Sequence, residues 1–295
     1  MKTLHRLISG ISIGAFWVCA LWLLPAWVLF LAILFCSTLC QLEFYNLAER
    51  GGHVTCRWVG LALGAVWLAT VFSFPCGGPP GPLAGDRWES LLAAGGGLLI
   101  LMMLLFDPRV KRPFDAAAIT LLGVFYVPFM LSFYIRLAQE GCSAPWTLSR
   151  GGIFVAFYLS LVVKLSDVGA YATGMLFGRH KMFPRISPGK SWEGLAGGLG
   201  LSVVASAVTV AIAHAGTVES TSFLCTLSYP VAAALGLLLG GVGVVGDLAE
   251  SMLKRSVNAK DSSSTIPGMG GLLDVFDSLL LAPAILYFLL PWLKA

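Results

Sequence analysis

The chain has 295 residues, of which 57% are hydrophobic and only 12% are charged, and its formal net charge is +4. A soluble domain carries roughly 25% charged residues and cannot enclose this much apolar surface in one core, so an ordinary soluble fold is excluded. The small, dispersed positive charge also argues against nucleic acid as a partner, and lipid is the expected solvent.

Apolar runs broken by Gly, Pro and charged residues predict about nine membrane-spanning helices, each close to the ~20 residues that cross a bilayer. In chain order they fall at residues 6–24, 26–48, 57–75, 88–106, 115–138, 152–178, 192–214, 227–250 and 271–293. The predicted fold class is therefore all-α, a polytopic transmembrane helical bundle.

The basic residues predict how this bundle is oriented. Most of the 19 Lys and Arg residues, including the clusters at 109–112, 179–190 and 254–260, share one side of the membrane if the N-terminus is cytoplasmic. The positive-inside rule favours this orientation. We expect an integral protein of a bacterial inner (cytoplasmic) membrane with its active site facing the cytoplasm; an organelle membrane is the alternative.

The two halves of the chain differ in polarity. Residues 1–140 are predicted to be N-terminal transmembrane helices with no ionisable group deep inside a span. Residues 151–295 are predicted to form a C-terminal transmembrane catalytic region with cytoplasmic polar loops. This second region places Lys164, Asp167, Asp247 and Glu250 within or at the ends of spans, where ionisable groups are costly and mark function. Its small-residue faces permit close helix packing and a homodimer.

Residues 246–278 contain a concentration of acidic side chains. Asp247, Glu250 and Ser251 share one helix face with Lys254, and Asp274 and Asp277 form an i, i+3 pair at the start of the last span. Grouped carboxylates suit a hard cation such as Mg²⁺, which commonly bridges substrate phosphates.

The loop between those two helices adds groups that suit an anion. Lys254, Arg255 and Lys260 are expected to bind phosphate oxygens, and Gly270 and Gly271 to let backbone N–H groups approach an anion at the helix start. These parts fit phosphoryl or nucleotidyl transfer. The alternative interpretation is that the basic residues only obey the positive-inside rule while the aspartates cap a helix.

A second polar cluster covers residues 164–194. Lys164 and Asp167 lie one helical turn apart, where they either pair with each other or leave Asp167 to line a polar intramembrane pocket. The loop that follows supplies five basic or titratable side chains, a density that suits anionic lipid headgroups or a triphosphate: Arg179, His180, Lys181, Arg185 and Lys190.

At these residues the sequence resembles the phosphatidate cytidylyltransferase (CDP-diacylglycerol synthase) family. The residues that match the family's signature in order and spacing are Ser251, Lys254, Arg255, Lys260, Asp261, Pro267, Gly270, Gly271, Asp274 and Asp277. The stretch from Ser166 to Gly194 also resembles a family block, so the resemblance covers roughly residues 160–280. Met269 stands where the family usually has His and Val275 where it usually has Arg, which puts activity in doubt more than membership.

The resemblance implies that CTP and phosphatidate react to give CDP-diacylglycerol and pyrophosphate with Mg²⁺ as cofactor. It implies a metal site formed by Asp247, Asp274 and Asp277. The other implied roles are catalytic for Ser251, Lys254, Arg255, Lys260 and Asp261, and substrate-binding for Asp167, Arg185, Lys190, Gly270 and Gly271.

Three alternatives to this function remain open at the level of sequence. A CTP-dependent kinase acting on a polyprenol-type lipid shares the nucleotide and the metal but attacks the γ-phosphate. A secondary transporter would use Lys164, Asp167 and Asp247 as a coupling site. A catalytically silent membrane relative would account for Met269 and Val275.

Overall fold

A computed structural model describes residues 25–74, 87–107, 110–142, 146–217, 222–266 and 270–294. Within these ranges the regular structure is helical apart from one short hairpin, so the predicted all-α class is confirmed. The helices are α2 (Ala26–Arg50), α3 (Arg57–Ser73), α4 (Arg87–Phe106), α5 (Pro113–Val124), η1 (Phe125–Phe129), α6 (Met130–Ala138), α7 (Arg150–Phe177), α8 (Trp192–Ile212), η2 (Ala213–Thr217), η3 (Phe223–Cys225), α9 (Tyr229–Ser256) and α10 (Leu273–Leu293).

Seven helical segments in the described residues are long and apolar enough to cross a membrane. They are α2, α4, the continuous run Pro113–Ala138, α7, the run Trp192–Gly216, α9 and α10; α3 is apolar but shorter, with 17 residues. The predicted span at 6–24 lies outside the described residues, so the number nine is not confirmed. The N-terminal orientation stays a prediction.

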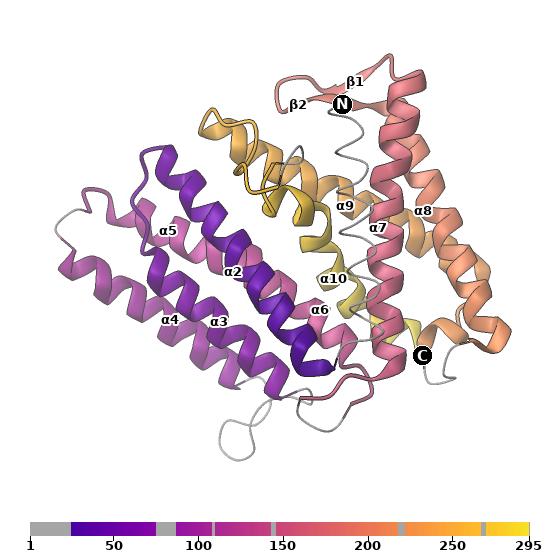
Figure 1. Ribbon diagram of the computed structural model, residues 1–295, viewed down its shortest axis with the longest axis horizontal. Coiled ribbons are helices and arrows are strands. Elements are labelled where there is room, and N and C mark those ends of the chain that lie inside the picture. The colour runs from indigo at the N-terminus through magenta and orange to yellow at the C-terminus, as the bar shows by residue number, and fades with distance from the viewer. Residues whose placement is uncertain are drawn as a thin grey trace.

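The helices pack so that α2 meets α10. Helix α7 packs along α8, α8 along α9 and α9 along α10, and α10 also contacts α6 and α2. Figure 1 shows α9 and α10 between the group formed by α3, α4 and α5 and the pair formed by α7 and α8. One buried apolar cluster includes Leu29, Tyr158, Leu239 and Leu280. Both predicted regions therefore contribute to this cluster, and their division into separate domains stays a prediction.

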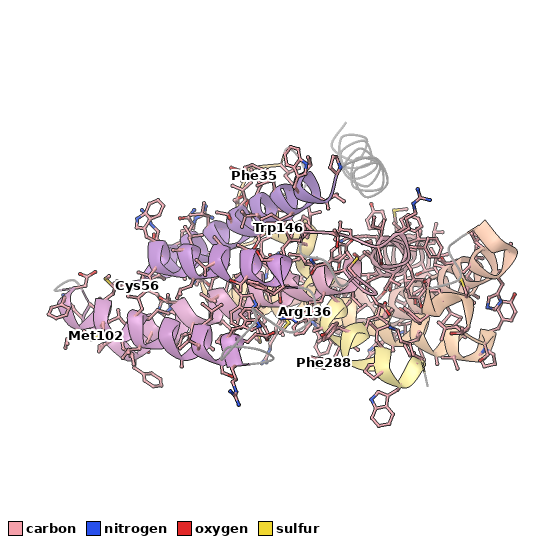
Figure 2. All side chains as sticks on the ribbon, turned by 90° about the horizontal axis from the view of Figure 1, so that it is seen from below. Phe35, Cys56, Met102, Arg136, Trp146 and Phe288 are labelled. Atoms are coloured by element: carbon pink, nitrogen blue, oxygen red, sulfur yellow. The ribbon has the colours of Figure 1, made fainter. Side chains whose placement is uncertain are left out.

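The outer surface of the bundle is apolar, as lipid contact requires. Phe35 on α2 and Phe288 on α10 are each 64% exposed, and both side chains lie at the outside of the bundle (Figure 2). The ionisable groups discussed below instead gather where α7, α9 and α10 meet.

A two-stranded hairpin joins α7 to α8 and was not predicted. Strand β1 (Lys181–Phe183) pairs antiparallel with β2 (Ser187–Ser191). The hairpin ends where Ser191 caps α8, its Oγ accepting a hydrogen bond from Gly194 N at 3.1 Å. The polar loop predicted for this segment is thus a defined element with fixed side-chain positions.

Three polar segments lie at the same end of the bundle. Arg50, the last residue of α2, donates from Nη1 to Ser262 O at 3.2 Å. Arg255 near the end of α9 donates from Nε to Ile186 O of the hairpin at 3.2 Å. The end of α2, the hairpin and the α9–α10 loop are therefore neighbours, although more than 200 residues separate the first from the last.

Candidate active site

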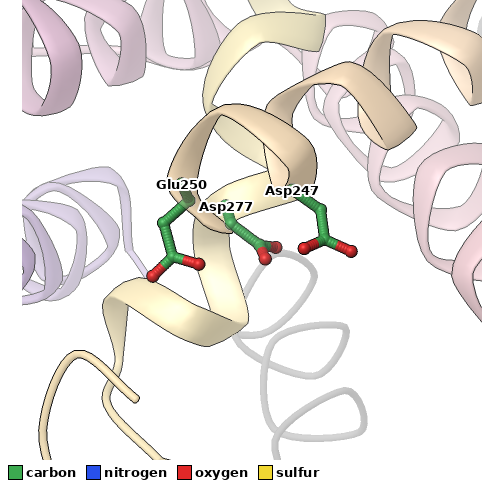
Figure 3. Close-up of side chains that lie close together, drawn as sticks. All are labelled: Asp247, Glu250 and Asp277. Carbon is green, nitrogen blue, oxygen red and sulfur yellow. The ribbon is translucent and has the colours of Figure 1, made fainter. Parts of the chain in front are cut away.

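Three carboxylates meet between α9 and α10. Asp247 and Glu250 on α9 and Asp277 on α10 each offer an oxygen, and these oxygens all lie within 4.8 Å of one another. Figure 3 shows Asp277 between the two residues of α9. Glu250 is 0% exposed and Asp277 is 8% exposed. The structure thus brings together two of the three residues predicted as metal ligands and adds Glu250, which the sequence analysis noted without assigning it a role.

The backbones of the two helices approach closely at this point. Gly246 precedes Asp247, and a Cβ atom at Gly246 would lie 2.5 Å from the carbonyl oxygen of Asp277. Real Cβ atoms are essentially never that close to another heavy atom. The i, i+3 spacing then turns Asp247 and Glu250 to the same face of α9, so glycine at 246 lets all three carboxylates converge.

The donor set fits a hard divalent cation. Carboxylate oxygens are the ligands that Mg²⁺ and Ca²⁺ prefer, and burying several acids together is unfavourable unless positive charge is supplied. Glu250 Oε1 has no hydrogen-bond partner in the described part of the chain. A buried carboxylate oxygen left over in this way is available to a cation, so the three residues are a coherent candidate metal site.

Two lysines pair with the acidic group, one at Asp247 and one at Glu250. Lys190 on β2 places its Nζ 3.0 Å from Asp247 Oδ2 and donates to Val244 O at 3.1 Å. Lys254, one turn after Glu250, forms an ion pair with it. The hairpin therefore places Lys190 beside Asp247, which lies 57 residues later in the chain. Both residues were predicted as site residues from the sequence.

Asp274 has a different environment from the group of three. Its Oδ1 lies 2.5 Å from Lys254 Nζ, and its Oδ2 accepts from Gly271 N at 2.6 Å and from Ser262 N and Oγ at 3.0 and 2.9 Å. Asp274 is not in the group of three carboxylates. In this arrangement it holds Lys254 and the start of α10, and its assignment as a metal ligand stays a prediction.

Lys164 and Asp167 on α7 join the site through α10. They pair at 3.3 Å, the pairing that the sequence allowed. Lys164 Nζ also donates to Val275 O at 2.7 Å and to Ser278 Oγ at 2.8 Å, and Ser278 Oγ lies 2.8 Å from Asp167 Oδ2. Ser278 follows Asp277, so this pair borders the acidic group.

The remaining predicted residues lie at the polar end of the bundle. Ser251 Oγ donates to Asp247 Oδ1 at 3.3 Å. Arg185, Arg255, Lys260 and Asp261 are exposed, and Arg255 donates within the protein to Ile186 O and Ala259 O.

The two predicted glycines lie where α10 begins. Gly270 has a φ of +100°, a left-handed conformation that favours glycine, and Gly271 uses its N–H on Asp274. Pro267 and Met269 fall outside the described residues.

Glu43 was not predicted from the sequence. No ionisable group was expected deep inside a span of residues 1–140, whereas Glu43 lies within α2 and is 6% exposed. The sequence signal for it was an acidic residue inside the apolar run 26–48. Placing such a residue in a membrane span is costly unless groups of the protein bind its carboxylate.

Comparisons with known proteins show what the chain is similar to. The chain matches the cytidylyltransferase family over residues 4–293. It is similar to proteins named phosphatidate cytidylyltransferase from Bacillus subtilis (33% identical over 177 residues), Mycobacterium tuberculosis (37% over 166) and Haemophilus influenzae (40% over 138). These matches cover 60%, 56% and 46% of this chain and 59%, 44% and 46% of the respective relatives. The chain thus spans about half the length of the curated relatives it matches.

Proposed function

The chain belongs to the cytidylyltransferase family, and from that premise we propose that it transfers CMP from CTP to phosphatidate. In this reaction a phosphate oxygen of the lipid forms a bond to the α-phosphorus of CTP. The bond between the α-phosphorus and the bridging oxygen breaks, and pyrophosphate leaves with the electron pair. The product is CDP-diacylglycerol.

The observation that carries the proposal is the group formed by Asp247, Glu250 and Asp277 beside Lys190 and Lys254. Acids that gather a divalent cation, next to lysines that bind phosphate oxygens, are the parts that phosphoryl and nucleotidyl transfer use. We assign Mg²⁺ to the three carboxylates. When bound, it would neutralise the triphosphate and the developing charge on the leaving pyrophosphate.

The protein's own residues orient the two substrates. Lys254 is held between Glu250 and Asp274, a position from which its ammonium group faces phosphate oxygens brought to the metal site. Lys190 reaches Asp247, another acid of the group, from the hairpin. Arg185, Arg255 and Lys260 are exposed around them and are proposed to collect the triphosphate from solution.

No side-chain nucleophile is required for this chemistry. A phosphate monoester carries between one and two negative charges near neutral pH, so the lipid phosphate is already the attacking group. Asp167, Asp261 and Ser251 are therefore proposed to act through hydrogen bonds and electrostatics. The two glycines, Gly270 and Gly271, are proposed to shape the turn at which the phosphates lie.

The position of the site agrees with a membrane-bound substrate. The acids lie toward one end of helices long enough to span a bilayer, next to polar loops and beneath an apolar outer surface. A lipid whose acyl chains stay in one leaflet can present its phosphate at this depth. We propose that this end faces the cytoplasm, where CTP is dissolved, and that the membrane is a bacterial inner membrane.

The test is product formation by the purified chain from phosphatidate micelles and CTP labelled at either the α- or the γ-phosphate. Magnesium-dependent transfer of the α-label to lipid is the expected result. Transfer of the γ-label instead would identify the lipid-kinase alternative. If a folded protein forms no labelled lipid, neither cytidylyl transfer nor the lipid-kinase activity holds, and the silent relative or the transporter is favoured. Substrate flux in liposomes without CTP turnover would then identify the transporter.

A further inference from the structure

Glu43 is a buried carboxylate that the proposed reaction does not use. It lies on α2, in the half of the chain that carries none of the predicted site residues, and it is 6% exposed. A buried carboxylate is strongly unfavourable unless hydrogen-bond donors satisfy it. What satisfies Glu43 is therefore informative about its role.

In the described part of the chain, every hydrogen bond to this carboxylate comes from the loop after α9 or from the first residue of α10. Glu43 Oε1 accepts from Ser263 Oγ at 2.6 Å and from Thr265 Oγ1 at 2.9 Å. Glu43 Oε2 accepts from Ser262 Oγ at 3.2 Å and from Leu273 N, the first residue of α10, at 2.8 Å. Four donors from one twelve-residue stretch thus converge on one acid more than 200 residues earlier in the sequence.

The same helix holds the loop at a second point. Arg50, two turns after Glu43, donates from Nη1 to Ser262 O at 3.2 Å. The spacing of seven residues puts both side chains on one face of α2. Helix α2 therefore contacts the loop at two points. The Glu43 carboxylate accepts hydrogen bonds inside the bundle, and the Arg50 guanidinium donates one at the end of the helix.

The loop that Glu43 and Arg50 contact is linked by hydrogen bonds to the candidate active site. Ser262 donates from its backbone N to Asp274 Oδ2, and its single hydroxyl proton is shared between Asp274 Oδ2 at 2.9 Å and Glu43 Oε2 at 3.2 Å. Asp274 in turn binds Lys254, which pairs with Glu250 of the acidic group. A continuous polar path therefore runs from Glu43 to the carboxylates between α9 and α10.

Gly271 explains how the acid reaches this loop. A Cβ atom at Gly271 would collide with Ser262 Oγ and with Glu43 Oε2. Any larger residue at 271 would displace one of these two groups, which gives this glycine a packing role beside the substrate-binding role predicted from sequence.

We propose that Glu43 is a positioning residue for the transfer reaction, and this inference rests on the proposed function. Its carboxylate is the acceptor that fixes residues 262–265 and the start of α10. In this way the N-terminal half of the chain orders the loop that carries Lys260 and Asp261 and the aspartate that holds Lys254.

Two substitutions of Glu43 separate positioning from simple stability. Glu43→Ala removes all four acceptor contacts. Glu43→Gln keeps the shape: its amide oxygen can accept from Ser262 and Leu273, while its NH₂ group faces the hydroxyls of Ser263 and Thr265, which can rotate to accept. Glu49→Ala is the matched control on the same helix, because Glu49 is exposed and pairs with Arg57 and Thr55 away from the loop.

The measurements are hydrogen exchange along the full-length protein in detergent and CDP-diacylglycerol formation. For Glu43→Ala we expect exchange in 260–274 to rise at least about tenfold, with α7 and α8 unchanged, and turnover to fall about 100-fold. For Glu43→Gln we expect loop protection to be kept and turnover to stay within about tenfold, a loss equivalent to one weakened hydrogen bond. Glu49→Ala should match the wild type in both measurements.

A variant pair on the loop side keeps the test decisive if Glu43→Ala does not fold. Ser263→Ala combined with Thr265→Val removes both donors to Glu43 Oε1 and should loosen the same loop. Ser264→Ala is its control, because Ser264 is exposed and no hydrogen bond from it to Glu43 is present.

Three results would count against the proposal. Unchanged loop exchange in Glu43→Ala would refute positioning outright. Equal loss of activity in the Ala and Gln variants with a protected loop would assign the role to the negative charge instead. If the wild type forms no lipid product, the proposed function fails, while the exchange data still decide whether Glu43 orders the loop.

Discussion

Replacing Gly246 by alanine tests whether close contact between α9 and α10 builds the acidic site. The new Cβ atom would lie 2.5 Å from Asp277 O and 3.4 Å from Asp277 C and Ser278 Cα, where ordinary contact begins at 3.4 Å. The helices must therefore separate locally by about 1 Å, because packed interiors have no free space to absorb the atom. Overpacking of this kind costs about 1–3 kcal/mol, and the better helix propensity of alanine offsets about 1 kcal/mol of it.

Activity is the more sensitive measurement of this change. A displacement of about 1 Å between reacting groups can cost about 100-fold in rate, so Gly246→Ala should lose most CDP-diacylglycerol formation while its thermal unfolding midpoint in detergent falls only modestly. Gly241→Ala on the same helix is the matched control, since its Cβ would meet only Leu199 Cδ2, at 4.0 Å. If the two variants are equally active and equally stable, the close approach does not organise the site.

Further substitutions test individual groups of the site. Glu250→Gln should raise the Mg²⁺ concentration for half-maximal activity at least about tenfold, measured by titrating Mg²⁺ at fixed CTP; an unchanged midpoint would remove Glu250 from the metal site. Asp274→Asn should lower turnover about 100-fold in a protein that still folds. An unchanged Mg²⁺ concentration for half-maximal activity would show that Asp274 acts through Lys254, and a raised concentration would support its predicted role as a metal ligand. Near-normal turnover would contradict both roles. Lys190→Gln should raise the KM for CTP about tenfold, the loss expected for one charged hydrogen bond, and an unchanged KM would exclude Lys190 from nucleotide binding.

The membrane helices could be predicted closely because each is a long apolar run with polar ends. The predicted span 152–178 is α7, Arg150–Phe177, and the predicted span 271–293 is α10, Leu273–Leu293. Hydropathy could not find the hairpin at 181–191, because its strands hold only three and five residues and show no apolar alternation. Its position depends on contacts with α9 that no local pattern contains.

The candidate site was predictable as a list of residues but not as a set of partners. Helical spacing put Asp247 and Glu250 on one face of α9 and marked Asp274 and Asp277 as an i, i+3 pair, which the family resemblance then included. Which of the two aspartates on α10 reaches that face depends on how α10 is rotated against α9 at Gly246, which is a tertiary fact. The structure turns Asp277 toward the acids and Asp274 toward Lys254.

Of the two departures from the family pattern, Val275 lies within the described residues, where its backbone contacts can be compared with the loss of the side chain. Val275 stands where the family usually has Arg, and its side chain packs, partly buried, against the apolar core. Its carbonyl oxygen accepts from Lys164 Nζ at 2.7 Å, a contact that any residue at 275 can provide. The link between α7 and α10 beside the acidic group therefore survives the substitution. Because the three converging carboxylates and both neighbouring lysines are also present, the geometry favours an active enzyme over a silent relative.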